Sequence, residues 1–289
     1  MKILLTGAAG LLGAALLPRL APEHDVVATF HQEPLKQHPA ITTIQIDLAL
    51  RDEVILLFHS HEIDCVINCA GAVDVDRCET DHDYAQRGNR DLVANLLAAQ
   101  QEHDFRLVHI STDYVFDGSS GPPDETVTPN PINFYGKSKL AGEELIRVAN
   151  RDYCIVRVCA LYSTDLEAKS NLYSKILAKL RGGESYPAAT DLFNNPTEVS
   201  DLAAALVSLA KHKQLPPLLH LASPEYLSRY DFAQQIARFN GLDESLVTAL
   251  TSDKIEFAAP RPNQAGLDSR LAEKKFSLRV KPLTELLRG

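Results

Sequence analysis

A tyrosine and a lysine near the middle of the chain have a spacing suited to proton transfer. Tyr135 and Lys139 lie four residues apart in the segment 133–144, where Asn133 can cap a helix and good helix formers follow Lys139. On a helix these two side chains share one face. An ammonium beside a phenol is expected to lower the tyrosine pKa, so that Tyr135 exchanges a proton with a substrate oxygen near neutral pH. The alternative is an exposed Tyr/Lys pair on an amphipathic helix.

A hydroxyl group is expected beside this pair. The apolar run from Phe105 to Ser111 predicts a buried strand, and Thr112 follows it directly. Ligands of open α/β sheets bind in the crevice beyond the carboxyl ends of the strands, where Ser111 and Thr112 would lie. Capping of an ordinary turn by these hydroxyl groups is the alternative. Residues 117–131, rich in Gly, Pro, Asp and Thr, predict a loop or lid.

Residues 2–20 predict a strand, a glycine turn and a helix. Gly7 permits a tight turn, Gly10 lets backbone amides approach a diphosphate, and Gly13 lets the helix pack closely on the sheet. A diphosphate at this turn would lie at the positive end of the helix dipole. Pro18 is expected to kink the helix 14–20 or to end it at about Leu17.

The next two predicted strands bear on the choice of cofactor. The strand 26–30 ends without the acidic residue that binds a ribose 2′-hydroxyl in NAD sites, and without an arginine for the 2′-phosphate of NADP. His31 and Lys36 are available cations, so NADP(H) is favoured, with NAD(H) as the alternative. After the strand 44–46, Asp47 either hydrogen-bonds an adenine ring or caps the helix that begins at Arg51.

The remaining pattern predicts an α/β protein with a Rossmann-type, doubly wound parallel sheet. Continuous apolar strands alternate with helices, which implies a sheet covered on both faces. Asn89 is either a surface residue or a bridge to the active site. We expect a dinucleotide-binding domain over 1–158 with a returning segment at about 196–222, and a smaller C-terminal α/β substrate lobe over 159–195 and 223–289. Further helices are expected over 51–61, 79–101, 171–180, 201–212 and 229–240, and strands over 65–70, 153–158 and 218–221.

Composition narrows the class of protein. The chain has 289 residues, 45% of them hydrophobic, and a net charge of -9. This length supports a full core, and the negative charge argues against nucleic acid or an anionic membrane as partner. No apolar run approaches the roughly 20 residues of a membrane-spanning helix. An odd number of cysteines without a secretion signal indicates reduced thiols and a cytoplasmic location. No Cys/His spacing predicts a metal site.

In combination, these motifs resemble the extended short-chain dehydrogenase/reductases, and within them the dTDP-4-dehydrorhamnose reductase family. The resemblance spans nearly the whole chain. It implies hydride transfer from a nicotinamide to the C4 ketone of a nucleotide-linked 4-keto-6-deoxy sugar. The motifs that carry it are Gly7/Gly10/Gly13, Asn68-Cys69-Ala70, the run from Ser111 to Gly118, Tyr135 with Lys139, and Arg261-Pro262 with Leu267-Asp268.

The resemblance also assigns roles to residues. Tyr135 would be the proton donor, Lys139 its partner and the ribose anchor, and Thr112 the hydroxyl that binds the substrate carbonyl. The related 4,6-dehydratases carry an Asp-Glu pair after this threonine; here Tyr114 follows Asp113, which favours a reductase. The diphosphate turn would comprise Gly7, Gly10, Leu11, Leu12 and Gly13, and the adenosine side Asp47, Leu48, Asn68 and Ala70.

On the substrate side the chain departs from the family. Ala160 stands where members often carry an aromatic residue, and Ala72-Val73 replaces a Tyr-Thr pair. Leu192-Phe193 follows Asp191 where Asp-Gln is usual, and Ala15 occupies the position of a glutamate that some bacterial members use in a metal-linked dimer. Two other functions therefore stay open. One is a non-catalytic, dinucleotide-binding regulatory subunit resembling the β subunit of methionine adenosyltransferase, and the other is a reductase of another carbonyl substrate. Monomer and homodimer are both open.

Overall fold

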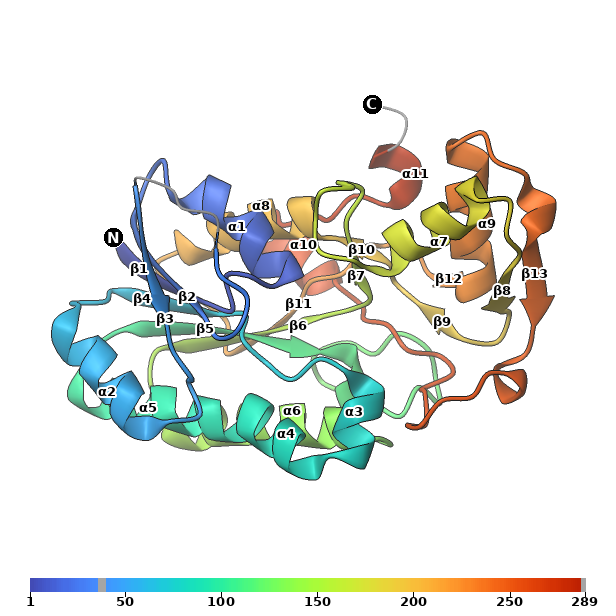
Figure 1. The fold of residues 1–289 in the computed structure, drawn as a ribbon. Coiled ribbons are helices and arrows are strands. Elements are labelled where there is room, and N and C mark those ends of the chain that lie inside the picture. Colours follow the sequence, from blue (N-terminus) through green and yellow to red (C-terminus); the bar gives the residue numbers. More distant parts are fainter. Residues whose placement is uncertain (36–39, 287–289) are drawn as a thin grey trace.

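A seven-stranded parallel sheet forms the centre of the protein (Figure 1). The structure is a computed structural model that describes residues 1–35 and 40–286. Every pair of neighbouring strands in this sheet is parallel, which confirms the predicted doubly wound α/β fold. The strand order is β11 (Leu218–His220), β6 (Tyr153–Val158), β5 (Arg106–Thr112), β4 (Cys65–Asn68), β1 (Lys2–Thr6), β2 (Asp25–Phe30) and β3 (Ile41–Gln45).

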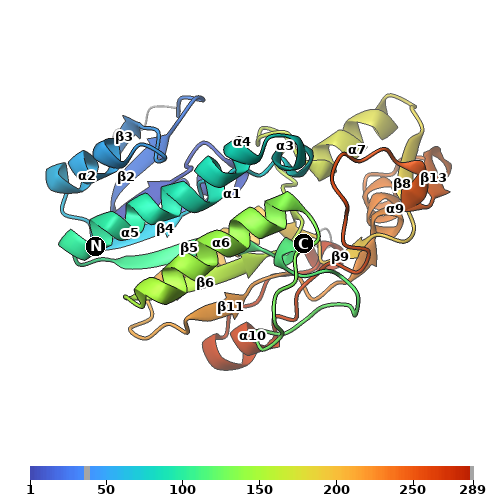
Figure 2. The ribbon, with the colours of Figure 1, turned by 90° about the horizontal axis from the view of Figure 1, so that it is seen from below.

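Helices cover both faces of the sheet (Figures 1 and 2). Strand β1 shows why both faces are apolar: Ile3 and Leu5 point into one core, and Leu4 points into the other. The first face is covered by α1 (Leu11–Leu20), α8 (Val199–Ala210) and α10 (Arg270–Phe276), and the second by α2 (Arg51–Ser60), α5 (Leu92–Glu102) and α6 (Phe134–Ala149).

The order of the strands reverses direction at β1. The chain runs outward from β1 to β2 and β3, and then crosses to β4 on the other side of β1. In sheets of this kind ligands usually bind beyond the carboxyl ends of the strands at such a reversal, which here are β1 and β4. The glycine turn follows β1, and Thr112 is the last residue of β5, so both lie at the carboxyl edge of the sheet.

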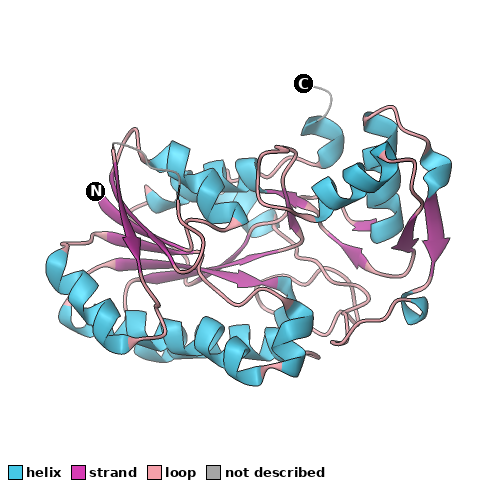
Figure 3. Ribbon diagram, in the orientation of Figure 1, coloured by secondary structure: helices cyan, strands magenta, loops and turns pink. Residues whose placement is uncertain are grey.

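A smaller lobe lies beyond this edge of the sheet (Figure 3). Helices α7 (Leu172–Arg181) and α9 (Arg229–Phe239) pack on the parallel strands β8 (Tyr186–Ala189) and β13 (Val247–Leu250) around their own buried core. Helix α8 and strand β11 return to the main sheet, where α8 packs on α1 and β11 pairs with β6. Helix α10 also packs against the main sheet. The expected domain limits stay a prediction.

Short elements complete the chain. Strand β7 (Leu161–Tyr162) pairs with β10 (Thr197–Glu198), and β9 (Phe193–Asn194) pairs with β12 (Leu227–Ser228). A last helix, α11, spans Leu283–Leu286, and single 3-10 turns span 113–115, 244–246 and 252–254. None of the two-residue strands was predicted, because two residues are too few to show a period. Among the described residues, no helix is both long and apolar enough to span a membrane.

The long helix expected over 79–101 is largely confirmed over residues 82–102, but it is interrupted at Asp81 and contains a π-helical turn. The chain instead forms α3 (Val75–Thr80), α4 (His82–Gln86), a π-helical turn (Arg87–Asp91) and then α5. Asp81 separates α3 from α4, and its carboxylate caps α4 by accepting a hydrogen bond from the Tyr84 amide at 3.0 Å. The apolar side of α5 is as expected, with Leu92, Leu96 and Leu97 buried.

The end of the helix expected at about Leu17 is wrong, since α1 continues to Leu20, and a kink at Pro18 stays a prediction. Pro18 lies in the last turn of the helix, where its missing N–H removes one hydrogen bond and few residues remain to be disturbed. The Arg19 side chain reinforces this turn by donating to the main-chain oxygen of Ala15 at 3.0 Å.

Candidate active site

The start of helix α6 is held against the end of strand β5. Asn133 caps the helix by accepting a hydrogen bond from the Gly136 amide at 2.8 Å, as predicted. A Cβ at Gly136 would lie 2.1 Å from the main-chain oxygen of Tyr114, so only glycine permits this approach. The close contact places Tyr135 beside Thr112. Tyr135 on α6 and Thr112 at the end of β5 are therefore neighbours in the fold.

The phenol of Tyr135 remains protonated near neutral pH. Burial raises its pKa, and the neighbouring Thr112 hydroxyl offsets part of that effect as a hydrogen-bonding partner. The prediction that Lys139 lowers this pKa is wrong for the free protein. Lys139 Nζ donates to the main-chain oxygen of Ile110 at 2.7 Å, so its ammonium group is engaged with strand β5. A protonated phenol is the form required of a proton donor.

Lys139 lies in a buried position on the same helix. Burial lowers its pKa to about 8, and Glu143, one turn further on, partly counteracts this effect. A Cβ at Gly71 would lie 3.8 Å from Lys139 Nζ, which places the ammonium group at the loop that follows strand β4. Lys139 thus joins α6, β5 and this loop at the carboxyl edge of the sheet.

Asn89 braces the tyrosine helix from behind. Its side-chain amide donates to Ser138 Oγ at 2.9 Å and to the oxygen of Ala72 at 3.0 Å, and its oxygen accepts from the Ala72 amide at 2.9 Å. Ser138 Oγ in turn donates to the main-chain oxygen of Tyr135 at 2.8 Å. Of the two roles considered for Asn89, the structure supports the bridge to the site. Asn89 lies in the π-helical turn, which places its side chain between Ala72 and Ser138.

The glycine turn forms a cradle of main-chain groups. Gly7 has a φ of +63°, and a Cβ there would lie 2.6 Å from the Ala70 amide nitrogen. A Cβ at Gly13 would lie 2.3 Å from the oxygen of Gly7. Helix α1 begins at Leu11 with no side-chain cap and no acidic residue in its first turn. Its first amide groups, from Leu11, Leu12 and Gly13, are therefore available to an anion such as a diphosphate.

Asn68 supports this cradle from inside the protein. Its side-chain oxygen accepts from Thr6 Oγ1 at 2.5 Å, and its amide pairs with His109 Nδ1 at 2.8 Å. The Ala70 amide also donates to Thr6 Oγ1, at 3.3 Å. These bonds fix the Asn68 side chain between Thr6 and His109. The expected cofactor role of Asn68 and Ala70 stays a prediction.

Asp47 does not cap helix α2. The cap residue is Leu50, which makes no side-chain hydrogen bond, whereas Asp47 accepts from the Ala49 amide at 2.9 Å. The other Asp47 oxygen pairs with Arg87 at 3.0 Å, and His31 Nε2 lies 4.0 Å from it. Arg87 is a cation at this end of the crevice that sequence reasoning missed. Contact of Asp47 and Leu48 with an adenine stays a prediction, and Lys36 falls outside the described residues.

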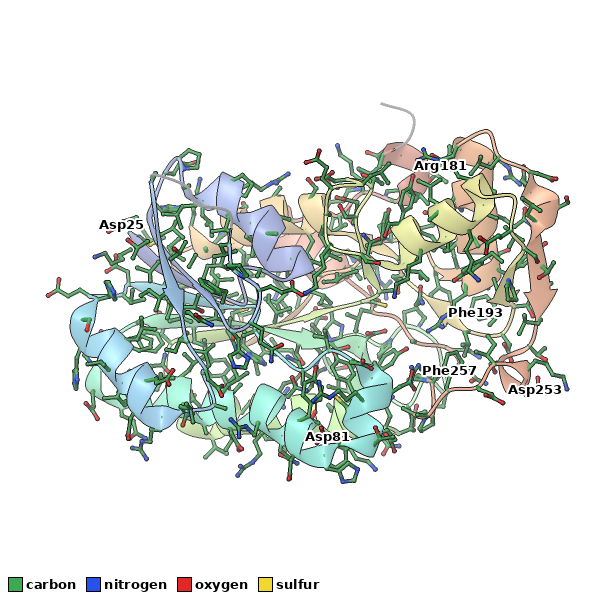
Figure 4. The ribbon with its side chains drawn as sticks, in the orientation of Figure 1. Asp25, Asp81, Arg181, Phe193, Asp253 and Phe257 are labelled. Atoms are coloured by element: carbon green, nitrogen blue, oxygen red, sulfur yellow. The ribbon has the colours of Figure 1, made fainter. Side chains whose placement is uncertain are left out.

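Two arginines face the site from the smaller lobe. The guanidinium groups of Arg261 and Arg229 lie 4.7 Å and 5.6 Å from the ring centroid of Phe257, and both lower the pKa of Tyr114 electrostatically. The Tyr114 ring meets that of Tyr135 edge-on, with centroids 5.9 Å apart. Figure 4 shows Phe257 on the segment that connects the smaller lobe back to the sheet.

The two guanidinium groups differ in their partners. Arg261 donates to Asp76 at 2.7 Å, whereas Arg229 Nε is buried without a hydrogen-bond partner among the described residues. Sequence reasoning missed Arg229 and Phe257, because a helix start and an isolated aromatic carry no local signal of a site.

One group of potential metal ligands occurs among the described residues. His59, Glu102 and His103 lie at the ends of α2 and α5, with ligand atoms within 4.8 Å of one another. These helix ends precede strands β4 and β5, so the group lies at the amino edge of the sheet, opposite the glycine turn.

Comparison with known proteins decides the family. A family model described as the RmlD substrate binding domain matches residues 1–288. The chain belongs to the RmlD family. It is 31% identical over 93% of its length to the probable low-salt glycan biosynthesis reductase Agl14 of Haloferax volcanii, of which it covers 90%. It is 29% identical over 92% of its length to methionine adenosyltransferase 2 subunit beta of Mus musculus, of which it covers 80%.

The solved structures agree with this assignment. The dTDP-4-dehydrorhamnose reductase of Bacillus anthracis, in complex with NADP, superposes with a TM-score of 0.88 and 27% identity, covering 99% of this chain and 97% of the other. The comparisons confirm the predicted family, the fold and the class of enzyme, an NAD(P)-dependent oxidoreductase acting on a CH-OH/C=O group. The roles of individual residues in this RmlD-family chain stay predictions.

Proposed function

We propose that this RmlD-family chain is an NAD(P)H-dependent reductase of a nucleotide-linked 4-keto-6-deoxy sugar, with Tyr135 as the proton donor. The convergence of Tyr135, Thr112 and Lys139 at the carboxyl edge of the sheet carries this proposal. These three groups come from a helix and a strand that Gly136 holds in contact. The names of the matched reductases support a sugar carbonyl as substrate.

The glycine turn fits the diphosphate of a nicotinamide dinucleotide. Side chains at Gly7 and Gly13 would fill the cradle, and the uncapped start of α1 offers amide groups to an anion. The bound cofactor would supply the hydride. Lys139 and Tyr135 would hold the nicotinamide ribose. The diphosphate would lie on Gly7, Gly10, Leu11, Leu12 and Gly13, and the adenosine on Asp47, Leu48, Asn68 and Ala70.

Proton transfer would start from the Tyr135 phenol. Its raised pKa keeps the proton on the oxygen until negative charge develops on the substrate carbonyl oxygen. Thr112 lies beside Tyr135 and would share the stabilisation of that charge. Lys139, one turn further along the same face of the helix, would hold the ribose and attract the phenolate that remains.

The nucleotide part of the substrate would bind near Arg229 and Arg261. A buried guanidinium nitrogen without a partner is unfavourable, and an anionic ligand would satisfy it. Two phosphate groups would suit the two cations around Phe257. For the cofactor, Arg87 and His31 would favour the 2′-phosphate of NADP(H) over NAD(H).

The decisive experiment follows the absorbance of NADPH and NADH with a dTDP-linked 4-keto-6-deoxy sugar. Tyr135→Phe should lower turnover by about 10²–10⁴-fold and leave the Kd for the cofactor nearly unchanged. Val148→Ala, at an exposed position on the same helix, is the matched control and should behave as the wild type. Full turnover by Tyr135→Phe would remove the tyrosine from the mechanism.

The relative named methionine adenosyltransferase 2 subunit beta favours a second candidate, a regulatory subunit that binds a dinucleotide without turnover. Ala72-Val73 and Ala160 on the substrate side are compatible with that role or with another carbonyl substrate. Stable association with a partner enzyme, together with no cofactor oxidation across a panel of keto-sugars, would favour the subunit. Oxidation with a carbonyl compound that carries no nucleotide would favour the other substrate. The cytoplasmic location and the choice between monomer and homodimer stay predictions.

A further inference from the structure

The Thr112 hydroxyl has its single proton engaged away from the expected substrate position. It donates to Asp113 Oδ1 at 3.1 Å and accepts from the Tyr114 amide at 3.2 Å. A hydroxyl group has one proton to donate. While that proton points at Asp113, Thr112 has no second proton to donate. To donate to a substrate carbonyl oxygen, as a stabilising group must, Thr112 has to be released from Asp113.

Asp113 itself lies in a closed polar pocket. Its side chain is almost fully buried, and its second oxygen accepts from Cys159 Sγ at 3.0 Å. The Gly266 amide is a further donor to the same carboxyl group. Among the described residues no lysine, arginine or histidine forms an ion pair with Asp113. A carboxylate held by neutral donors alone is well placed to change its protonation state.

The surroundings of Asp113 support such a change. Burial raises its pKa to about 6, against the lowering effect of the hydrogen bonds from Cys159 and Thr112. Three other titratable groups face it: Cys159 at the end of β6, Tyr114 beside it in the chain, and Tyr135 on α6. The pKa of each of these three is raised, chiefly by burial, so all three stay neutral near pH 6.

We propose that Asp113 is a positioning residue that sets the direction of the Thr112 hydrogen bond. When Asp113 is ionised, it takes the Thr112 proton in a hydrogen bond. When Asp113 is protonated, it donates to Thr112 Oγ1, and the Thr112 proton is free to point at the substrate carbonyl oxygen. Asp113 gains or loses its proton by equilibration with the solvent as the pH changes, and it passes no proton to the substrate during turnover. This inference rests on the proposed reductase function.

Asn in place of Asp113 imitates the protonated state permanently. An asparagine of the same shape can present its NH₂ group to Thr112 and its oxygen to Cys159, the two partners that the two carboxylate oxygens have now. Turnover by the wild type should fall as the pH rises from 5.5 to 7. Turnover by Asp113→Asn should be flat over this range and exceed that of the wild type at pH 7.

The test measures kcat at saturating cofactor and sugar. NADH is used alongside NADPH, because a phosphate monoester also titrates at about pH 6. Asp117→Asn, an exposed carboxylate in the same sequence motif, should keep the wild-type profile. In a Thr112→Val background, Asp113→Asn should have no further effect on kcat, since Asp113 acts through Thr112. Two results would overturn the proposal. One is a pH dependence of kcat in Asp113→Asn equal to that of the wild type. The other is a change in kcat caused by Asp113→Asn in the Thr112→Val background that is as large as in the wild-type background.

An infrared titration of the free protein separates this proposal from the proposed function. A carboxylic acid band that appears near pH 6 in the wild type and is missing in Asp113→Asn supports the switch whether or not a substrate is found. Its absence from the wild type would overturn the switch even if the protein reduces a keto-sugar. A lack of turnover by the wild type with every keto-sugar would count against the reductase and leave the infrared result standing.

Discussion

Glu143 and Arg157 form a buried two-point ion pair that joins helix α6 to strand β6. Arg157 Nε donates to Glu143 Oε1 at 2.9 Å, and its Nη2 donates to Oε2 at 2.6 Å. Ser111 Oγ adds a third hydrogen bond to Glu143 at 2.5 Å. Since Ser111 precedes Thr112 and Glu143 follows Lys139 by one turn, Glu143 ties α6 to both β5 and β6 close to the candidate catalytic groups.

Removal of the Glu143 charge should destabilise the fold. Glu143→Gln leaves the guanidinium group of Arg157 buried without its counter-charge, which typically costs about 3–5 kcal/mol. Urea unfolding at neutral pH measures the change. Glu285→Gln, which breaks the exposed Arg279–Glu285 pair of 2.7 Å, should have little effect. Equal effects of the two substitutions would show that the buried pair does not support the fold.

A methyl group at Gly7 should weaken cofactor binding. In Gly7→Ala the new Cβ meets the Ala70 amide in addition to the strain of a positive φ, so the cradle has to open. Gly241→Ala provides the control, because Gly241 has a similar φ of +64° and its Cβ would meet no atom of the described residues within 4 Å. Calorimetric titration with NADPH should show a weaker affinity for Gly7→Ala and an unchanged affinity for Gly241→Ala. Unchanged affinity would place the diphosphate elsewhere.

The choice between cofactors should depend on Arg87. Arg87→Ala removes a cation beside Asp47 and should weaken NADPH binding by about tenfold, a change of roughly 1.4 kcal/mol, with little effect on NADH. Arg90→Ala, in the same π-helical turn and paired with Asp91, is the matched control. The measured quantity is the ratio of the two Kd values. A parallel loss for both cofactors would mean that Arg87 does not contact the 2′-phosphate.

Activity should fall as the pH rises through the pKa of Lys139. The ammonium form predominates below about pH 8 and loses its proton above it, so steps that need the charge are favoured on the acid side. Lys139→Met should remove this alkaline limb of kcat/KM along with most of the activity. Lys137→Met, at an exposed position of the same helix, should keep the limb. A limb that persists in Lys139→Met belongs to another group.

The elements around the cofactor could be predicted closely, because each is bounded by a sharp local signal. Strand β1 ends at Thr6, where Gly7 begins the turn, and helix α6 begins after its cap Asn133. Strand β6 has the predicted bounds, and its start is marked by the polar run Asn150-Arg151-Asp152. The family resemblance came from the order of these signals along the chain, which the fold then brought to one edge of the sheet.

Other features depend on contacts between distant residues and could not be predicted. The residues of the π-helical turn that begins at Arg87 have the same pattern as an ordinary α-helix, so the turn has no signal in the sequence. Its wider winding goes with the hydrogen bonds of Asn89 to Ala72 and Ser138. The raised pKa of Tyr135 results from burial, which the spacing to Lys139 does not reveal. The approach of Arg229 to Phe257 is a tertiary contact within the smaller lobe, which no local pattern reveals.

One amide group links the two parts of the protein at the candidate proton donor. While the oxygen of Asn133 starts the tyrosine helix, its nitrogen donates to the main-chain oxygen of Pro260 at 3.0 Å, in the segment that leads out of the smaller lobe. A displacement of that segment would pull on the first turn of α6. Evolutionary changes in the lobe that alter substrate choice would therefore also alter the placement of Tyr135, so that specificity and rate in this enzyme cannot be tuned independently.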